Sequence, residues 1–128
     1  MAQTQALLPN EIDLYKEITA LDMKLDEYIQ LFDKSRRCEI GRQISDLCLV
    51  LIRYCCLAWR IPEERLYYLR KFEAEYTTLD YLIRKCHKPT VKQLSDKQYL
   101  ECAQIQARIA KQLSGWIRST MKNDETKG

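Results

Sequence analysis

The chain of 128 residues has little of what tight turns and most catalytic sites require. It contains only three glycines, three prolines and one histidine. Because Gly and Pro make most tight turns, their scarcity favours long helices over many short strands. No glycine-rich phosphate loop and no Gly-x-Ser-x-Gly motif is present. The sequence therefore predicts an all-α protein without a recognisable catalytic motif.

Long apolar runs are also absent. The longest mostly apolar stretch, Leu47 to Trp59, is interrupted by Arg53 and is too short to cross a bilayer. The start of the sequence, from Met1 to Asn10, lacks the basic residues and the apolar run of a secretory signal. We therefore expect a cytoplasmic protein that does not contact a membrane.

The six cysteines form no Cys-x-x-Cys pair, and a single histidine offers one imidazole ligand at most. Free thiols that pack as small hydrophobes are therefore favoured over a zinc site, and the expected reducing compartment disfavours a disulfide framework. We expect buried structural thiols and no metal or other cofactor. These cysteines are Cys38, Cys48, Cys55, Cys56, Cys86 and Cys102.

Catalytic pairs are hard to build from the remaining residues. Cys86 and His87 are neighbours in the sequence, and neighbours on a helix point about 100° apart, so they would not act as nucleophile and base. Glu73 and Glu75 do not share a helical face either. The Glu-x-x-His pattern of di-metal bundles is missing. We expect a protein that is not an enzyme and that binds other macromolecules.

Apolar residues recur at three- and four-residue steps in four segments, as amphipathic helices require. Asn10 is a candidate cap of the first segment, and Ser95 with Gln98 forms a capping box at the last. The second segment is apolar on most sides between Leu47 and Cys56, which predicts the most buried helix. The expected helices run from about Asn10 to Asp33, Arg37 to Arg60, Pro62 to Cys86, and Ser95 to Thr120, with His87 to Leu94 as a loop.

Four such helices with short connections predict an antiparallel up-down four-helix bundle. Residues 1–120 would form a single domain, and the polar residues 121–128 would form a disordered tail. Gly41 lies inside the second helix and weakens it by about 1 kcal/mol relative to Ala, for which close helix packing is one reason. Because the apolar stripes are broad and rich in tyrosine, a homo-oligomer is also expected.

Charge is distributed unevenly along the chain. Residues 1–33 carry two lysines and seven acidic residues, a balance of −5, and the remaining 19 basic and 11 acidic residues give +8. A basic surface attracts phosphates, although a solvated helix face is the common alternative. A second basic cluster, Lys34, Arg36 and Arg37, is expected at the first turn between helices and would extend this surface. The acidic first helix either neutralises a basic neighbour or forms the solvated outside of the bundle. The candidate phosphate and partner contacts are Arg84, Lys85, Lys88, Lys92, Arg108, Lys111 and Arg118.

Two segments near the end resemble a known family. Gln-Leu-Ser-Asp-Lys-Gln-Tyr at 93–99 and Ala-Lys-Gln-Leu-Ser-Gly-Trp-Ile-Arg at 110–118 resemble the closing segments of accessory variability determinant (Avd) proteins of diversity-generating retroelements. That family has a Leu-Ser-x-x-Gln-Tyr helix start and a Leu-Gly-Gly-Trp-like finish, and here Ser114 replaces the first Gly. The resemblance covers about residues 34–119. The related ribosomal-RNA intervening-sequence proteins carry a segment that is absent here.

The resemblance implies a homopentameric barrel with a basic surface. Such a protein would bind the retroelement reverse transcriptase and nucleic acid, either template RNA or cDNA, and would support mutagenic retrohoming without polymerase activity of its own. Arg84 and Lys85 stand where family members carry basic residues, and Gly115 with Trp116 would have a structural role, Gly allowing close approach. The alternative is a protein–protein adaptor bundle without physiological nucleic-acid contact.

Overall fold

The computed structural model describes residues 8, 9 and 11–127, and within them all regular structure is helical. Helices α3, α4 and α5 are long, α1 is somewhat shorter, and α2 is a single turn that leads through a π-helical turn into α3. The elements are α1 (Asp13–Ile29), α2 (Lys34–Arg36), η1 (Arg37–Gly41), α3 (Arg42–Arg60), η2 (Pro62–Glu64), α4 (Arg65–His87) and α5 (Asp96–Lys127).

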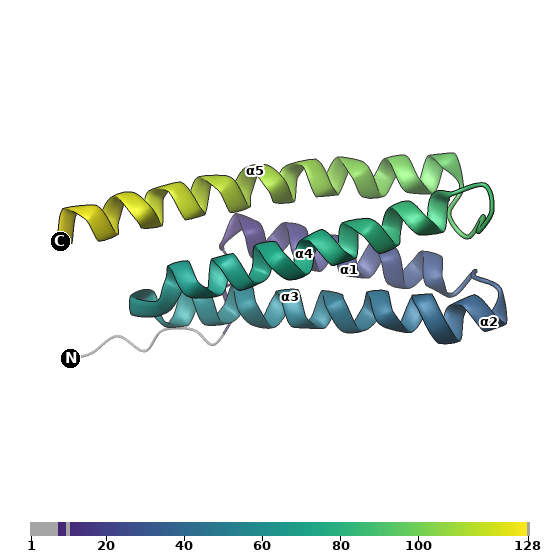
Figure 1. Ribbon diagram of the computed structural model, residues 1–128, viewed down its shortest axis with the longest axis horizontal. Helices are drawn as coiled ribbons and strands as arrows, with labels where there is room; N and C mark the ends of the chain where they lie inside the picture. Colours follow the sequence, from purple (N-terminus) through teal and green to yellow (C-terminus); the bar gives the residue numbers. More distant parts are fainter. Residues whose placement is uncertain (1–7, 10, 128) are drawn as a thin grey trace.

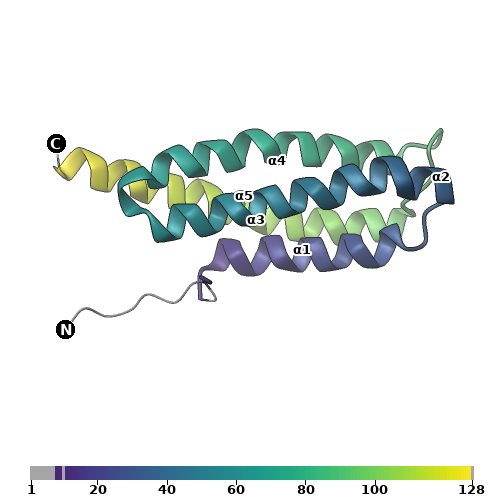
Figure 2. The ribbon, with the colours of Figure 1, turned by 90° about the horizontal axis from the view of Figure 1, so that it is seen from below.

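The four longer helices lie side by side as a bundle (Figures 1 and 2). Helix α1 packs against α3 and α5, and α4 packs against α3 and α5, so each of the four has two neighbours. The expectation of an all-α four-helix bundle is therefore confirmed. The turn after α1 and the loop between α4 and α5 lie at the same end of the bundle (Figure 2).

One apolar core runs between the helices and contains the predicted stripes. Its fully buried members include Leu21 of α1, Leu51 of α3, Phe72 of α4 and Ile109 of α5, one from each long helix. The second predicted helix is not the most buried one, since five of the 19 residues of α3 are buried against six of the 17 residues of α1, and Leu49 on its outer side is 57 % exposed. A helix with two neighbours keeps an outward face, and α3 places apolar residues there as well.

Several helix ends differ from the sequence expectation. Helix α1 begins at Asp13, and the candidate cap Asn10 lies outside the described residues. It also ends earlier than expected, at Ile29, because the amides of Leu31 and Phe32 bond to carbonyls three residues back in a tight turn. His87 belongs to α4 rather than to the loop that follows.

The capping box at the start of α5 is confirmed. The Ser95 amide donates to Gln98 Oε1 at 3.0 Å, and the Gln98 amide donates to Ser95 Oγ at 3.1 Å. The predicted helix end at Thr120 is wrong, because α5 continues to Lys127, through residues expected to form a disordered tail. No Gly or Pro interrupts the chain between Trp116 and Gly128, so the helical backbone has no strong stop signal there.

Gly41 lies directly against α1. It is buried at the end of η1, and a Cβ at this position would lie 2.8 Å from Cγ2 of Ile29. That methyl group sits on a β-branched carbon next to the α1 backbone, so it has little freedom to move. Gly115 on α5 is the opposite case, since a Cβ there would meet nothing within 4 Å.

Replacing Gly41 with Ala should therefore lower the free energy of unfolding by about 1–2 kcal/mol. Overpacking costs about 1–3 kcal/mol, and the better helix propensity of Ala returns up to about 1 kcal/mol of it. Chemical denaturation followed by circular dichroism measures the difference. Gly115→Ala is the matched control and should stabilise the protein by about 0.5–1 kcal/mol. Equal stabilisation by both substitutions would contradict the close approach.

Candidate nucleic-acid interface

Two segments distant in sequence are joined at one end of the bundle. The Asp33 amide donates to Oε1 of Gln93 at 2.8 Å, and Nε2 of Gln93 donates to a carboxylate oxygen of Asp33 at 3.0 Å. The same Gln93 side chain also donates to the Val91 carbonyl. The amides of Gln93 and Leu94 bond to the Cys86 carbonyl at the end of α4. The turn after α1 is thereby held against the α4–α5 loop.

Basic residues from both segments gather at this end. Burial raises the pKa of the Cys86 thiol to about 11, and the charges of Lys85 and Arg36 oppose that rise. Both cations therefore lie near one thiol, although α2 and α4 are far apart in the sequence. Within the described part of the chain, no carboxylate lies within ion-pair distance of Lys88 or Lys92. We call the following set the basic end: Lys34, Arg36, Arg37, Arg84, Lys85, Lys88 and Lys92.

The carboxylates near the basic end are mostly engaged. Asp80 holds Arg84 through its Oδ2 atom, 2.8 Å from Nε, and this contact raises the pKa of the guanidinium. Asp96 lies 2.7 Å from Nε2 of His87, and Asp33 is bonded to Gln93. Glu39 in η1 is exposed. Among the described residues, Lys85, Lys88 and Lys92 therefore have no carboxylate within ion-pair distance.

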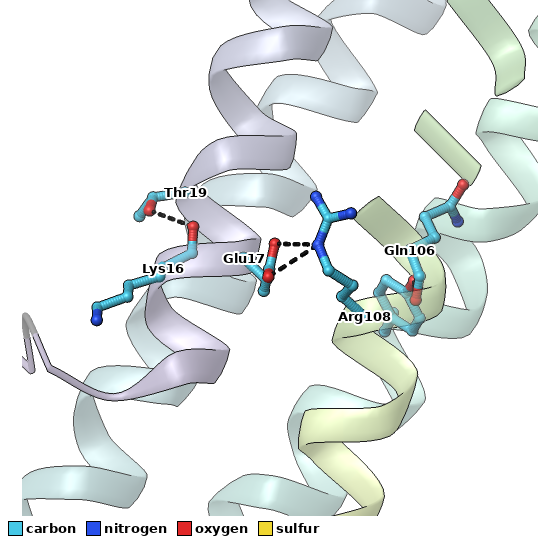
Figure 3. Close-up of polar contacts among 6 residues, drawn as sticks. Lys16, Glu17, Thr19, Gln106 and Arg108 are labelled. Atoms are coloured by element: carbon cyan, nitrogen blue, oxygen red, sulfur yellow. Dashed lines mark hydrogen bonds and ion pairs between the residues drawn. The ribbon is translucent and has the colours of Figure 1, made fainter. Parts of the chain in front are cut away.

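The other candidate contacts do not join this surface. Arg108, Lys111 and Arg118 follow the exposed side of α5, and Arg108 lies about 18 Å along the helix from Asp96 at 1.5 Å per residue. Arg108 Nε also lies 2.9 and 3.0 Å from the two carboxylate oxygens of Glu17 on α1 (Figure 3). The structure therefore divides the predicted site residues into a basic end and a separate basic ridge on α5.

The acidic helix α1 turns part of its charge toward α5. Besides the Glu17–Arg108 pair, Lys24 lies 3.8 Å from Glu101 on α5 and 3.9 Å from Glu27. The Tyr28 hydroxyl donates to the Glu101 carboxylate, and this hydrogen bond lowers the pKa of Glu101. The acidic first helix was expected either to neutralise a basic neighbour or to form the solvated outside of the bundle. Glu17 does the former, because it pairs with Arg108 of α5.

An aromatic pair beside the basic end was not predicted from the sequence. The rings of His87 and Tyr99 are stacked, with centroids 4.1 Å apart and planes 4° apart. His87 ends α4 and Tyr99 lies in the first turns of α5, so the stack joins both sides of the loop. Only the position of the two residues on either side of a short loop hinted at this contact.

The remaining sequence candidates are placed as follows. Cys48, Cys55, Cys86 and Cys102 are buried as expected, and burial raises the pKa of the Cys55 thiol to about 12. Cys38 is exposed, contrary to the expectation of buried thiols, because it lies on the outer side of η1.

Trp116 is half-buried, and the Arg65 guanidinium lies 5.5 Å from its ring centroid. Gly115 permits no close approach within the chain, since a Cβ there would have open space around it. The resemblance implies that this glycine allows a close approach, but no such contact is present at Gly115 in the single chain.

Comparisons with known proteins found no matching family model, no matching curated protein and no matching solved structure. Among the described residues, no helix is both long enough and apolar enough to cross a membrane. The same residues contain no group of three or more His, Cys, Asp or Glu side chains arranged to hold a metal ion.

Proposed function

We propose that this chain is a non-enzymatic accessory protein that binds nucleic acid through the basic end. The observation that carries the proposal is the convergence of Lys85, Lys88 and Lys92 with the basic residues of α2 at one end of the bundle. Lys and Arg side chains bind phosphates without reading the base sequence. The ligand class is therefore a nucleic acid recognised through its backbone, either template RNA or cDNA.

The resemblance to Avd proteins supports the same proposal and adds a biological role. In that role the protein binds the reverse transcriptase of a diversity-generating retroelement and supports mutagenic retrohoming. The bundle would be antiparallel and up-down, with its two longer connections at the basic end. The ridge of Arg108, Lys111 and Arg118 on α5 would remain available for acidic patches of the polymerase or for further phosphates, except where Glu17 already neutralises Arg108.

Loss of charge at the basic end should weaken binding. We expect the triple substitution of Lys85, Lys88 and Lys92 by Ala to reduce affinity for RNA at least tenfold. It should also lower the log–log salt slope by about 2 to 3, since each lost phosphate contact removes about 0.7 to 0.9. Fluorescence anisotropy at several salt concentrations measures both quantities.

The matched control removes the same charge elsewhere, through Lys16, Arg53 and Arg60 to Ala. All three side chains are exposed and lie on α1 and α3, outside the basic end. A purely non-specific cationic surface would lose equal affinity in both triple variants, which would contradict the proposed interface. A flat salt response in the unaltered protein would favour the protein–protein adaptor instead.

Self-association is the second part of the proposal. Several large apolar side chains lie on the outside of the single chain, where contact with another copy would remove them from water. Leu49, Tyr67 and Tyr81 are each 56–57 % exposed, and Leu31 is 72 % exposed. A second copy of the chain is an occupant that would cover such positions.

Light scattering after size exclusion should give the mass of a pentamer. Five chains of 15.2 kDa have a combined mass of about 76 kDa. A monomer mass near 15.2 kDa would remove the barrel from the proposal and leave the basic end to be tested on the single chain.

A further inference from the structure

A groove opens between α4 and α5 directly beside the basic end. Its volume is about 300 Å³, and α5 supplies Ala103, Ala107 and Ala110 to its lining. These alanines follow one another at four- and three-residue steps, so their methyl groups lie on one face of the helix. The α5 side of the groove is therefore lined by small apolar side chains, beside the longer Gln106 of the same helix.

Aromatic rings form the walls of this groove. Tyr76 comes from α4 and Tyr99 from α5. The Tyr76 hydroxyl donates to the Gln106 carbonyl at 3.3 Å, which ties its ring to α5. Tyr99 is held by the parallel stack with His87, and Asp96 fixes the His87 ring in turn. Both rings are thus positioned before any ligand arrives, which reduces the entropy lost on binding.

A fixed guanidinium lies at the same groove. Asp80 binds Arg84 through Oδ2, and its Oδ1 accepts a hydrogen bond from Gln106 Nε2 at 2.9 Å. The Arg84 side chain is nevertheless 64 % exposed, so part of its flat surface faces solvent. Guanidinium planes and aromatic rings are the groups on which proteins stack unpaired bases. Lys85 follows Arg84 in α4, and Lys88 and Lys92 follow in the adjoining loop.

We infer that the groove binds an unpaired base of single-stranded nucleic acid whose phosphates lie on Lys85, Lys88 and Lys92. This inference rests on the proposed function and specifies its substrate class. The bases of a duplex are stacked and paired, so none is free to enter a side groove. A single strand offers a planar base, which fits between two aromatic rings, a row of alanine methyl groups and an exposed guanidinium. The groove volume is at the lower end of the range for small-molecule sites.

The experiment compares single-stranded RNA of about 12 nucleotides with the duplex of the same sequence, by fluorescence anisotropy. The unaltered protein should bind the single strand at least tenfold more tightly. Tyr99→Leu should reduce affinity for the single strand by about 5- to 100-fold, the range expected for one lost stacking contact. Its affinity for the duplex should change less than twofold. Tyr15→Leu is the matched control, since Tyr15 is half-buried like Tyr99 but lies on α1, outside the groove.

A second variant blocks the groove without removing any contact group. Ala107 is exposed on α5, so Ala107→Leu fills the groove at a helix position that tolerates Leu well. It should reduce single-strand affinity as Tyr99→Leu does, and circular dichroism confirms that both variants are folded. If Tyr99→Leu fails to fold, the Ala107→Leu result decides the question alone.

The outcomes separate this inference from the proposed function. If the protein bound single strand and duplex equally well and neither groove variant changed the affinity, the inference that the groove binds a base would be wrong. The proposed function would still stand if the triple lysine variant weakened binding of both forms. Loss of the lysine effect as well would mean that the basic end itself does not bind nucleic acid. A preference for the single strand that disappears in Ala107→Leu would support base binding in the groove.

Discussion

The paired hydrogen bonds between Asp33 and Gln93 hold together the end of the bundle on which the proposed function depends. They join residues that are 60 positions apart and bring the turn after α1 against the α4–α5 loop. Without this contact, the basic residues of α2 and those of α4 would be two separate local clusters. With it they form one positive surface, whose mutual repulsion the Asp33–Gln93 hydrogen bonds oppose.

The same end also contains the least regular part of the backbone. The π-helical turn η1 leads from α2 into α3 and ends at Gly41, which lies against Ile29 of α1. Lys92 in the loop has a positive φ of 53°, a backbone conformation that residues other than glycine seldom adopt. Irregular backbone therefore coincides with concentrated positive charge, whereas the opposite end is a short turn through Pro62.

Periodicity was enough to predict the helices and most of the core, because stripes such as Ile44, Cys48 and Leu51 reflect local geometry alone. It could not place the outer faces, so the second helix was expected to be the most buried although Leu49 lies on its outer side. Charge counting found Lys85, Lys88 and Lys92, yet grouped them with Arg108, which pairs instead with Glu17 across the bundle. That pair, the Asp33–Gln93 contact and the His87–Tyr99 stack depend on tertiary packing, for which one sequence carries no local signal.

Lysine footprinting tests the location of the interface most directly. The protein is acetylated with and without bound RNA, and mass spectrometry measures the modification of each lysine. If the account is right, RNA protects Lys34, Lys85, Lys88 and Lys92 and leaves Lys16 and Lys71 as reactive as before, because the latter two lie away from the basic end. Protection centred on Lys111, with Lys88 and Lys92 still reactive, would contradict it and move the interface to the ridge on α5.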